Sequence, residues 1–277
     1  MTDSTIGFIG GGNMAASIIG GLVPDQINAD HICVFDPNPD TCQRLAIDYK
    51  ISICSNNEEL LSRSDIIVLA VKPQVMQAVL QPLASIAQAQ RPLFISIAAG
   101  IPCAHMNAWL DTGSNEEHAI VRVMPNTPAL VKAGASGLYA NQHVSEHQRL
   151  QAQNLMQAVG SAAWVPEEAN IDAVTALSGS GPAYFMLFVK SLTEAGVNAG
   201  LTADVARQLA IDTCAGSASL MASSEHDIQQ LIDNVTSPGG TTEQALLSFK
   251  AQELPRVVET AFNAALKRSE ELAEELG

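Results

Sequence analysis

The chain has 277 residues, 47% of them hydrophobic and 16% charged, which gives it room for a sizeable buried core and too much apolar material to stay disordered. This size and composition exclude peptide hormones and disulfide-stapled miniproteins and predict one large or two medium domains. The 14 basic and 29 acidic residues give a net charge of -15, which argues against nucleic acid or an anionic membrane surface as a partner.

The amino-terminal segment MTDSTIGFIGGG has no basic stretch followed by a long apolar one, and no window approaches the roughly 20 apolar residues of a membrane span. The five cysteines are scattered and form no C-x-x-C pair, which is typical of buried thiols in a reducing compartment rather than of disulfides or a zinc site. These features predict a soluble, cytoplasmic protein without a membrane partner.

Short apolar runs alternate with helical stretches from residue 5 to about residue 165, which is the pattern of βαβ units and a parallel sheet. The runs are nearly all apolar, as expected for strands covered on both faces. The predicted strands are 5–10, 31–36, 51–54, 65–71, 92–98 and 119–123.

After Pro166 the strand-like runs stop and helical patterns continue to the end of the chain. The predicted helices are 169–177, 182–198, 203–221, 227–234, 241–250 and 254–276. We therefore predict a first domain over residues 1–161 and a helical domain over residues 162–277. The helical half is rich in Ala and Leu and carries 16 acidic against 6 basic residues, which favours packing against a second copy with the charges outside.

A glycine-rich segment directly after the first predicted strand reads G-x-G-x-x-A at Gly10, Gly12 and Ala15, and it opens a helix that runs to about Leu22. In a dinucleotide-binding fold, Gly10 permits the tight turn, Gly12 lets the backbone approach a pyrophosphate, and Ala15 lets helix and strand pack closely. The phosphates would lie at the helix N-terminus, where N–H groups bind an anion without a lysine. The alternative is an ordinary glycine-rich turn, but the strand–turn–helix context favours a Rossmann-type, doubly wound parallel sheet.

Asp36 ends the second predicted strand, where an acidic side chain accepts hydrogen bonds from the adenosine ribose 2′-OH. The next basic residue, Arg44, lies well into the following helix, so a 2′-phosphate would meet a carboxylate without a guanidinium beside it. This arrangement favours NADH over NADPH. The alternative role of Asp36 is that of a turn or cap residue before Pro37.

Two other catalytic arrangements find little support. No tyrosine has a lysine four residues on, so the sequence lacks the Tyr-x-x-x-Lys pair of short-chain oxidoreductases. His143 to His147 read H-x-x-E-H, the pattern of some zinc peptidases. However, Ser145 and Gln148 predict a capping box for a helix over 146–159, which leaves His143 outside the helix. A zinc ion needs both imidazoles on one helical face and a third ligand, so no metal is predicted.

Two loops stand out by their composition. Residues 121–129, VRVMPNTPA, end the last predicted strand with a rigid, polar, proline-flanked loop, which would face the ligand crevice at the carboxyl edge of a doubly wound sheet. Residues 236–243, TSPGGTTE, lie between predicted helices, and their N–H and hydroxyl groups can bind a small carboxylate at a helix start. The alternative for the second loop is an ordinary helix start capped by Ser or Thr.

Six segments in order resemble pyrroline-5-carboxylate reductases over essentially the whole chain. They are GFIGGGNMA from Gly7, AVKP from Ala70, SIAAG from Ser96, RVMPNTPA from Arg122, LSGSGPAY from Leu177 and VTSPGGTT from Val235. The resemblance implies an α/β protein with an N-terminal Rossmann-type domain and a C-terminal all-helical dimerisation domain, whose active site is completed at the dimer interface. It further implies reduction of 1-pyrroline-5-carboxylate to L-proline, the last step of proline biosynthesis, with NADPH often favoured.

The resemblance also assigns ligand contacts to positions of this sequence. The implied cofactor contacts are Gly10, Gly11, Gly12, Asn13, Met14, Asp36, Asn57, Ala70, Val71, Lys72, Pro73, Ser96, Ala98, Ala99, Gly100 and, in the proline-flanked loop, Asn126. The implied substrate contacts are Val235, Ser237, Gly240, Thr241 and Thr242, with Glu225 nearby. Asp36 departs from the small polar residues often found at its position in this family, so NADH and NADPH both stay open.

Reduction of a cyclic imine does not require the catalytic acid that the sequence lacks. Such an imine can enter already protonated, so hydride addition to its carbon gives a neutral amine and requires no catalytic His or Tyr, only alignment of the two reactants. We expect the Thr242 hydroxyl to hydrogen-bond the ring nitrogen, and Ser237 with the N–H groups of Gly240 and Thr241 to bind the carboxylate. Lys72 is expected to contact the cofactor rather than to act as an acid.

Two other functions stay open at this point. A β-hydroxyacid dehydrogenase shares the two-domain plan but uses a lysine on the first helix of its second domain as an acid. The corresponding helix, 182–198, carries Lys190 in an apolar run, which favours an exposed position for this lysine. A redox sensor, in contrast, would bind the dinucleotide and a protein partner without turnover. The sequence predicts neither the oligomer size beyond a dimer, nor the range of imines accepted, nor inhibition by proline.

Overall fold

The computed structural model describes residues 4–23 and 27–276 and divides the chain into two compact units. The sheet unit comprises residues 1–180 together with 265–277, and the helical unit comprises residues 181–264. The boundary predicted between residues 161 and 162 falls inside a strand of the sheet unit, β8 (Gly160–Trp164). The assignment of a cofactor domain and a substrate domain to the two parts stays a prediction.

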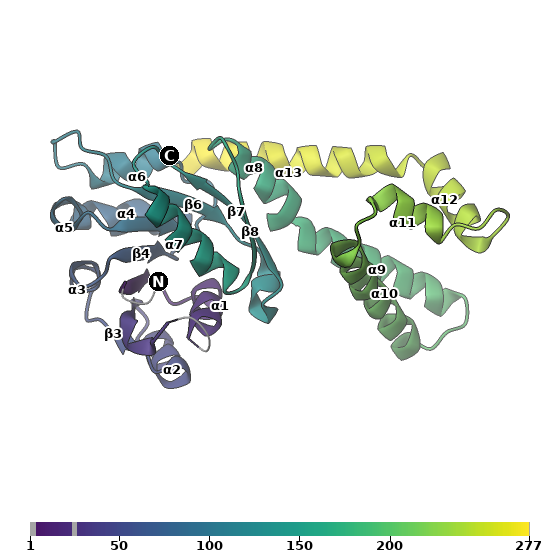
Figure 1. The fold of residues 1–277 in the computed structure, drawn as a ribbon, viewed down its shortest axis with the longest axis horizontal. Coiled ribbons are helices and arrows are strands. Elements are labelled where there is room, and N and C mark those ends of the chain that lie inside the picture. The colour runs from purple at the N-terminus through teal and green to yellow at the C-terminus, as the bar shows by residue number, and fades with distance from the viewer. Residues whose placement is uncertain (1–3, 24–26, 277) are drawn as a thin grey trace. The chain divides into compact units, whose positions relative to one another are not determined.

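The sheet unit contains an eight-stranded sheet in the order β3-β2-β1-β4-β5-β6-β7-β8 (Figure 1). The strands before β8 are β1 (Ile6–Ile9), β2 (Ile32–Phe35), β3 (Ser52–Ile53), β4 (Ile66–Leu69), β5 (Leu93–Ser96), β6 (Ile120–Met124) and β7 (Gly134–Ala140). The first six are parallel and coincide with the six predicted strands. Five of them are short, mostly apolar runs covered on both faces, whereas β3, at the edge of the sheet, has two residues and Ile53 is exposed. The predicted fold class, a Rossmann-type doubly wound sheet followed by helices, is confirmed.

Two strands of the sheet were not predicted. β7 pairs with β6 in the antiparallel direction, and β8 pairs with β7 in the parallel direction. Their sequences, GASGLYA and GSAAW, contain no β-branched residue and several glycines and alanines, which have low strand propensity. Pairing of β7 with β6 and of β8 with β7, rather than local preference, therefore places these segments in the sheet.

Helices cover both faces of this sheet and separate its core into two clusters. On one face, α1 (Asn13–Leu22), α2 (Pro39–Tyr49) and α7 (Glu146–Gln157) pack on residues such as Phe8 and Val68. The helices that bury the other face are α3 (Asn57–Ser62), α4 (Met76–Leu80), α5 (Ala84–Gln90) and α6 (Cys103–Leu110). Phe94 belongs to this second cluster and is fully buried. A short helix, α8 (Asn170–Val174), and a π-helical turn (Thr175–Gly179) end the first stretch of the unit.

The helical unit contains the helices expected from the sequence. They are α9 (Gly181–Asn198), α10 (Ala203–Ser223), α11 (Ile228–Asn234), α12 (Thr241–Ala251) and the first part of α13 (Leu254–Leu276). The last turns of α13 belong to the sheet unit, where the Ser269 hydroxyl lies 2.6 Å from Oδ1 of Asp172. Only Gly181, Ala206 and Ala210 are buried in the helical unit, all of whose residues lie in the described part of the chain.

The structure also gives the state of the cysteines and the length and polarity of the helices. All five cysteines are free thiols, and four are buried while Cys214 is half-buried. Within residues 4–23 and 27–276, no helix is both long and apolar enough to cross a bilayer.

Candidate functional site

The loops predicted to hold the cofactor lie together at the carboxyl edge of the sheet. β1 lies between β2 and β4, so the chain changes direction across the sheet at this strand, and ligands of doubly wound sheets bind outside such a switch point. The segments that follow β1, β4, β5 and β6 contain, respectively, residues 10–12, 70–73, 96–100 and 125–126.

The glycine-rich turn after β1 has the geometry that the motif predicts. Gly10 adopts φ +97°, and a Cβ there would lie 2.7 Å from the Ala70 carbonyl oxygen, so only glycine fits. Gly12 begins α1, and a Cβ on it would meet nothing within 4 Å. No side chain caps α1, so the amide groups of its first turn have no side-chain acceptor. These features fit a pyrophosphate at the helix start.

Asp36 takes the turn role considered for it, and its role as a ribose contact stays a prediction. It directly follows β2, and its Oδ1 accepts a hydrogen bond from the Asn38 amide at 2.9 Å, as in an Asx turn. Its Oδ2 accepts a hydrogen bond from the Gly11 amide at 2.8 Å. The carboxylate therefore lies against the glycine-rich turn, at the position expected for a ribose contact.

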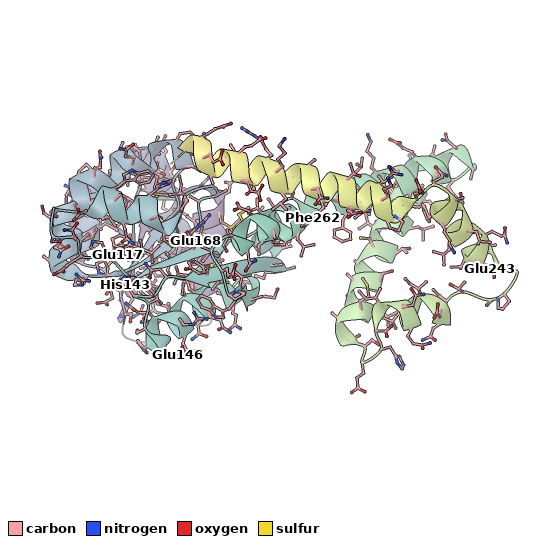
Figure 2. All side chains as sticks on the ribbon, turned by 90° about the horizontal axis from the view of Figure 1, so that it is seen from above. Glu117, His143, Glu146, Glu168, Glu243 and Phe262 are labelled. Carbon is pink, nitrogen blue, oxygen red and sulfur yellow. The ribbon has the colours of Figure 1, made fainter. Side chains whose placement is uncertain are left out.

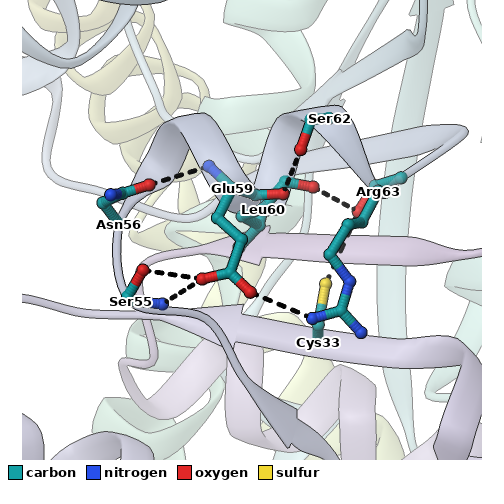
Figure 3. Close-up of polar contacts among 8 residues, drawn as sticks. Cys33, Ser55, Asn56, Glu59, Leu60, Ser62 and Arg63 are labelled. Atoms are coloured by element: carbon teal, nitrogen blue, oxygen red, sulfur yellow. Dashed lines mark hydrogen bonds and ion pairs between the residues drawn. The ribbon is translucent and has the colours of Figure 1, made fainter.

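The start of α3, which carries Asn57, is held by a polar cluster (Figure 3). The carboxylate of Glu59 accepts hydrogen bonds from the Ser55 hydroxyl at 2.7 Å and the Ser55 amide at 2.8 Å, while Arg63 Nη1 lies 3.1 Å from it. The Asn56 side chain caps the helix through the Glu59 amide at 2.7 Å. The hydrogen bonds from Ser55, with a further one from Arg63, hold the pKa of Glu59 below its usual range. Asn57 is thus presented from a rigid turn.

The segments after β4 and β5 supply one exposed cation and one tight turn. Lys72 is exposed and precedes the short 3-10 turn Pro73–Val75. Ser96 is buried, and its hydroxyl lies 3.4 Å from the amide of Ala98. Gly100 adopts φ +74°, the left-handed region that favours glycine.

Asn126, predicted as a cofactor contact, has both ends of its buried amide engaged. Its Oδ1 accepts a hydrogen bond from the Ala135 amide at 2.9 Å. Its Nδ2 donates to the Ser178 carbonyl at 3.0 Å, in the π-helical turn. In this structure the side chain fixes the loop after β6 rather than pointing free into the crevice.

An ion pair between a buried arginine and a half-buried glutamate at the same edge was not predicted from the sequence. Arg122 on β6 is 4% exposed, and its Nη1 lies 3.0 Å from Glu168 Oε1. The same carboxylate oxygen accepts a hydrogen bond from the Cys103 amide at 2.7 Å. Burial, and secondarily Glu168, raises the pKa of both the Cys103 thiol and the Tyr139 hydroxyl, so both groups stay protonated. No sequence signal links Arg122 to a residue 46 positions away.

The predicted substrate residues lie in the helical unit, at the start of α12. Gly239 adopts φ +72°, and the Gly240 amide donates to the Ser237 carbonyl at 2.9 Å, which closes a tight turn. Glu243, labelled in Figure 2, accepts a hydrogen bond from the Gly239 amide at 2.8 Å. No Ser or Thr side chain caps α12, so the ordinary capped helix start considered above is not what forms. The first-turn amides of Thr241 and Thr242 are therefore uncapped.

Glu225 is not brought together with the rest of this set. It lies between α10 and α11, and Val235 follows α11 directly. The seven residues of α11 rise by about 10 Å, so the two residues are at opposite ends of this helix. Val235 itself is 61% exposed.

The rival sites have other roles in the structure. His143 precedes α7, as its predicted capping box requires, and its Nε2 lies 2.7 Å from Glu117 (Figure 2). Groups of three or more His, Cys, Asp or Glu able to hold a metal ion are absent from the described part of the chain. The Lys190 side chain is 70% exposed and lies 3.6 Å from Glu194, one turn along α9, which confirms its expected exposed position.

Two family models match the chain. Residues 5–100 match the family described as NADP oxidoreductase coenzyme F420-dependent, and residues 168–272 match pyrroline-5-carboxylate reductase dimerisation. The first match covers the glycine-rich turn and the second covers the start of α12.

Full-length relatives carry one name. The pyrroline-5-carboxylate reductase of Pseudomonas aeruginosa is 48% identical and covers 100% of both chains, and that of Haemophilus influenzae is 40% identical over 98% of both. A solved pyrroline-5-carboxylate reductase from Coxiella burnetii has a TM-score of 0.93 at 38% identity over 98% of both chains. The Plasmodium falciparum pyrroline carboxylate reductase, solved with NADP bound, has a TM-score of 0.84 at 31% identity over 99% of both. The chain therefore belongs to the pyrroline-5-carboxylate reductase family.

Proposed function

We propose that this protein reduces 1-pyrroline-5-carboxylate to L-proline, the last step of proline biosynthesis, with a reduced nicotinamide dinucleotide as the hydride donor. The observation that carries the proposal is the full-length similarity to reductases of that name, which spans both units. The geometry supports it, because each unit offers one uncapped helix start suited to an anion, at α1 and at α12.

The chemistry asks little of the protein beyond alignment. When bound, the nicotinamide would supply a hydride to the carbon of the C=N bond, and the π electrons of that bond would become a lone pair on nitrogen. A substrate that enters as the protonated imine leaves as a neutral ring amine, so no protein group has to donate a proton. The task of the chain is to orient two bound reactants, which by itself can lower a barrier by about 7–11 kcal/mol.

For the cofactor, we infer that the pyrophosphate lies at the start of α1. The Gly11 amide already donates a hydrogen bond to Asp36, which leaves the amides of Gly12, Asn13 and Met14 to bind the phosphates. The adenosine end would contact Asp36 and Asn57, and the nicotinamide end would lie along residues 70–73 and 96–100. Asn126 would act mainly by holding the loop after β6, given its two internal hydrogen bonds.

For the substrate, we infer that the turn before α12 binds the carboxylate. The Ser237 hydroxyl and the amides of Gly240 and Thr241 are its proposed donors, and Val235 is proposed to line the site. The Thr242 hydroxyl would hydrogen-bond the ring nitrogen and orient the imine carbon. This role makes Thr242 the proposed catalytic residue.

The preference between NADH and NADPH is proposed to follow from Asp36. Its carboxylate accepts two backbone hydrogen bonds beside the glycine-rich turn, where it would accept a hydrogen bond from a ribose hydroxyl and leave no room for a 2′-phosphate. The relative solved with NADP shows what another member binds, at 31% identity. We therefore expect this chain to use both cofactors and to favour NADH.

A homo-oligomer follows from the match to a dimerisation family over residues 168–272. We propose that its unit is a dimer formed through the helical domain, with each active site completed by the second copy. The proposed compartment is the cytoplasm.

The function is tested with purified protein in three assays: oxidation of NADH or NADPH with the imine, reduction of NAD+ or NADP+ with a 3-hydroxy acid, and oxidation of the reduced cofactor with nothing added. The proposal predicts rapid oxidation that depends on the imine. Turnover of the 3-hydroxy acid alone would favour a β-hydroxyacid dehydrogenase, and cofactor binding without turnover would favour a redox sensor. The ratio of kcat/KM for NADH to that for NADPH measures the effect of Asp36.

A further inference from the structure

The ion pair between Arg122 and Glu168 has no role in the proposed chemistry. Arg122 is almost wholly enclosed in the sheet unit, and its Nε and Nη2 make no hydrogen bond within the described residues. Among the described residues its charged partner is Glu168, at 3.0 Å, and the Glu168 side chain is 28% exposed. Burying the charge of an arginine is costly, and an apolar side chain of similar size is often as stabilising. Stability alone therefore gives a weak reason for Arg122 to lie in the core.

The position of the pair suggests another reason. Arg122 is opposite Ser96 in the parallel register of β5 and β6, and Ser96 begins the tight turn 96–100. Glu168 Oε1 also accepts the amide of Cys103, three residues after Gly100, where α6 starts without a side-chain cap. One carboxylate oxygen thus connects Arg122, beside the start of this turn, with the start of α6, three residues after its end.

The same ion pair lies close in sequence to the two segments that hold the loop after β6. Arg122 is two residues before Met124, the last residue of that strand. The loop that follows is tied by Asn126 to Ser178, in the π-helical turn ten residues beyond Glu168. The segment from Glu168 to Ser178 is therefore fixed to the carboxyl edge at two points, by the ion pair of Glu168 with Arg122 and by the hydrogen bond from Asn126 to Ser178.

We propose that Arg122 and Glu168 are positioning residues that set the distance between the turn 96–100 and the loop after β6, and so shape the surface against which the nicotinamide end of the cofactor lies. This inference rests on the proposed cofactor role of those two segments. The pair does not touch the reacting atoms and acts through the backbone that it holds.

The test compares Glu168→Gln, Arg122→Lys and the apolar double variant R122M/E168M with wild type. The matched control is Arg91→Met, which breaks an exposed ion pair with Glu116 just before β5, at the amino edge of the sheet. Equilibrium binding of NADH by fluorescence, KM for each substrate, and the thermal midpoint are measured for each protein. Because NADH binding needs no turnover, it tests positioning independently of the proposed reaction.

The proposal predicts that Glu168→Gln raises the NADH dissociation constant and the cofactor KM about tenfold, with the KM for the imine within about twofold of wild type. Arg122→Lys keeps the positive charge but loses the planar, multi-donor guanidinium, so its NADH dissociation constant should lie between those of wild type and Glu168→Gln. The double variant should have a higher thermal midpoint than Glu168→Gln but should bind NADH no more tightly than that variant does. Arg91→Met should bind NADH as wild type does.

Two results would overturn the positioning role. One is a lower thermal midpoint in Glu168→Gln with unchanged NADH binding. The other is recovery of both stability and NADH binding in the double variant. The proposed function fails separately, if wild-type protein binds NADH but does not reduce the imine.

Discussion

The two units of this chain bury their apolar residues to very different degrees. In the sheet unit, side chains such as Phe8, Phe94 and Leu60 are fully enclosed between the sheet and its helices. In the helical unit, Phe185, Met186 and Leu187 on α9 are 63–67% exposed, and the buried positions are one glycine and two alanines. A monomer rarely exposes apolar side chains in such density unless another surface covers them.

Because of this difference, the two proposed sites depend on different cores for their stability. The cofactor edge rests on a core that one chain completes by itself. The turn before α12 rests on helices whose apolar faces need further burial, which the match to a dimerisation family over residues 168–272 explains. Stability of the substrate site should therefore depend on protein concentration, whereas stability of the cofactor edge should not.

The largest effect is expected from removing a core side chain of the sheet unit. Phe94→Ala should lower the free energy of unfolding by about 3–5 kcal/mol, because it leaves a cavity in a close-packed layer. Phe185→Ala, its counterpart on α9, should leave the unfolding of the sheet unit unchanged and weaken the homo-oligomer. Chemical denaturation and sedimentation at several protein concentrations measure both. Equal, concentration-independent losses would mean that the helical unit has a sufficient core of its own.

The next effect concerns cofactor binding without loss of stability. Gly12 adopts φ -64° and ψ -177°, which alanine tolerates, and its Cβ direction is open. Gly12→Ala should therefore unfold like wild type but bind NADH about 10–100-fold more weakly, because the methyl group occupies the space that the pyrophosphate approaches. Gly10→Ala, two residues earlier, should lose stability as well. Unchanged NADH binding in Gly12→Ala would remove the pyrophosphate from this turn.

A smaller effect is expected at the substrate site. Thr242→Ala should lower kcat/KM for the imine by an amount equivalent to about 1–3 kcal/mol, as for one lost polar contact, and leave NADH binding intact. Thr242→Ser, which keeps the hydroxyl, should recover most of the activity. Steady-state kinetics with the imine varied at saturating NADH measure the change. If the alanine variant has the kinetics of wild type, Thr242 does not orient the ring nitrogen.

The smallest effect is a pH dependence confined to the sheet unit. Burial, and to a lesser degree Arg91, lowers the pKa of His118 from its usual 6.5. The unfolded chain then binds a proton near pH 6.5 that the folded protein does not, so this contribution to stability is complete above pH 6.5 and declines as the pH falls toward the folded pKa. The neighbouring Glu116 and Asp111 oppose the shift.

His118→Leu should remove that decline. In denaturation at pH 8, 6.5 and 5.5, the free energy of unfolding of wild type should fall relative to that of the variant as the pH decreases. Parallel pH profiles for the two proteins would assign the acid sensitivity to other groups.

Local patterns made the first six strands, the glycine-rich turn and most helix bounds predictable. Gly10 and Gly12 follow an apolar strand and open a helix, and each of these signals lies within a few residues. The capping box of Ser145 and Gln148 is equally local and forms as predicted. These features depend on neighbours in sequence, which a single chain displays.

The features that the sequence did not reveal depend on distant partners. β7 and β8 form because they pair with β6 and each other, against their own weak strand propensity. Glu168 finds Arg122 and the Cys103 amide only once the sheet exists. The final turns of α13 join the sheet unit through Ser269 and Asp172, 97 positions apart, so the helical segment is not confined to one unit.

Transfer of labelled hydride tests the central claim most directly. Purified protein is incubated with the imine and NADH that carries deuterium at both C4 positions of the nicotinamide, and the product is analysed by mass spectrometry. The account predicts proline with one deuterium on the ring carbon that was the imine carbon, formed in equal amount to the NADH oxidised. NADH that binds and stays unoxidised, or proline without deuterium, would contradict direct hydride transfer by this protein.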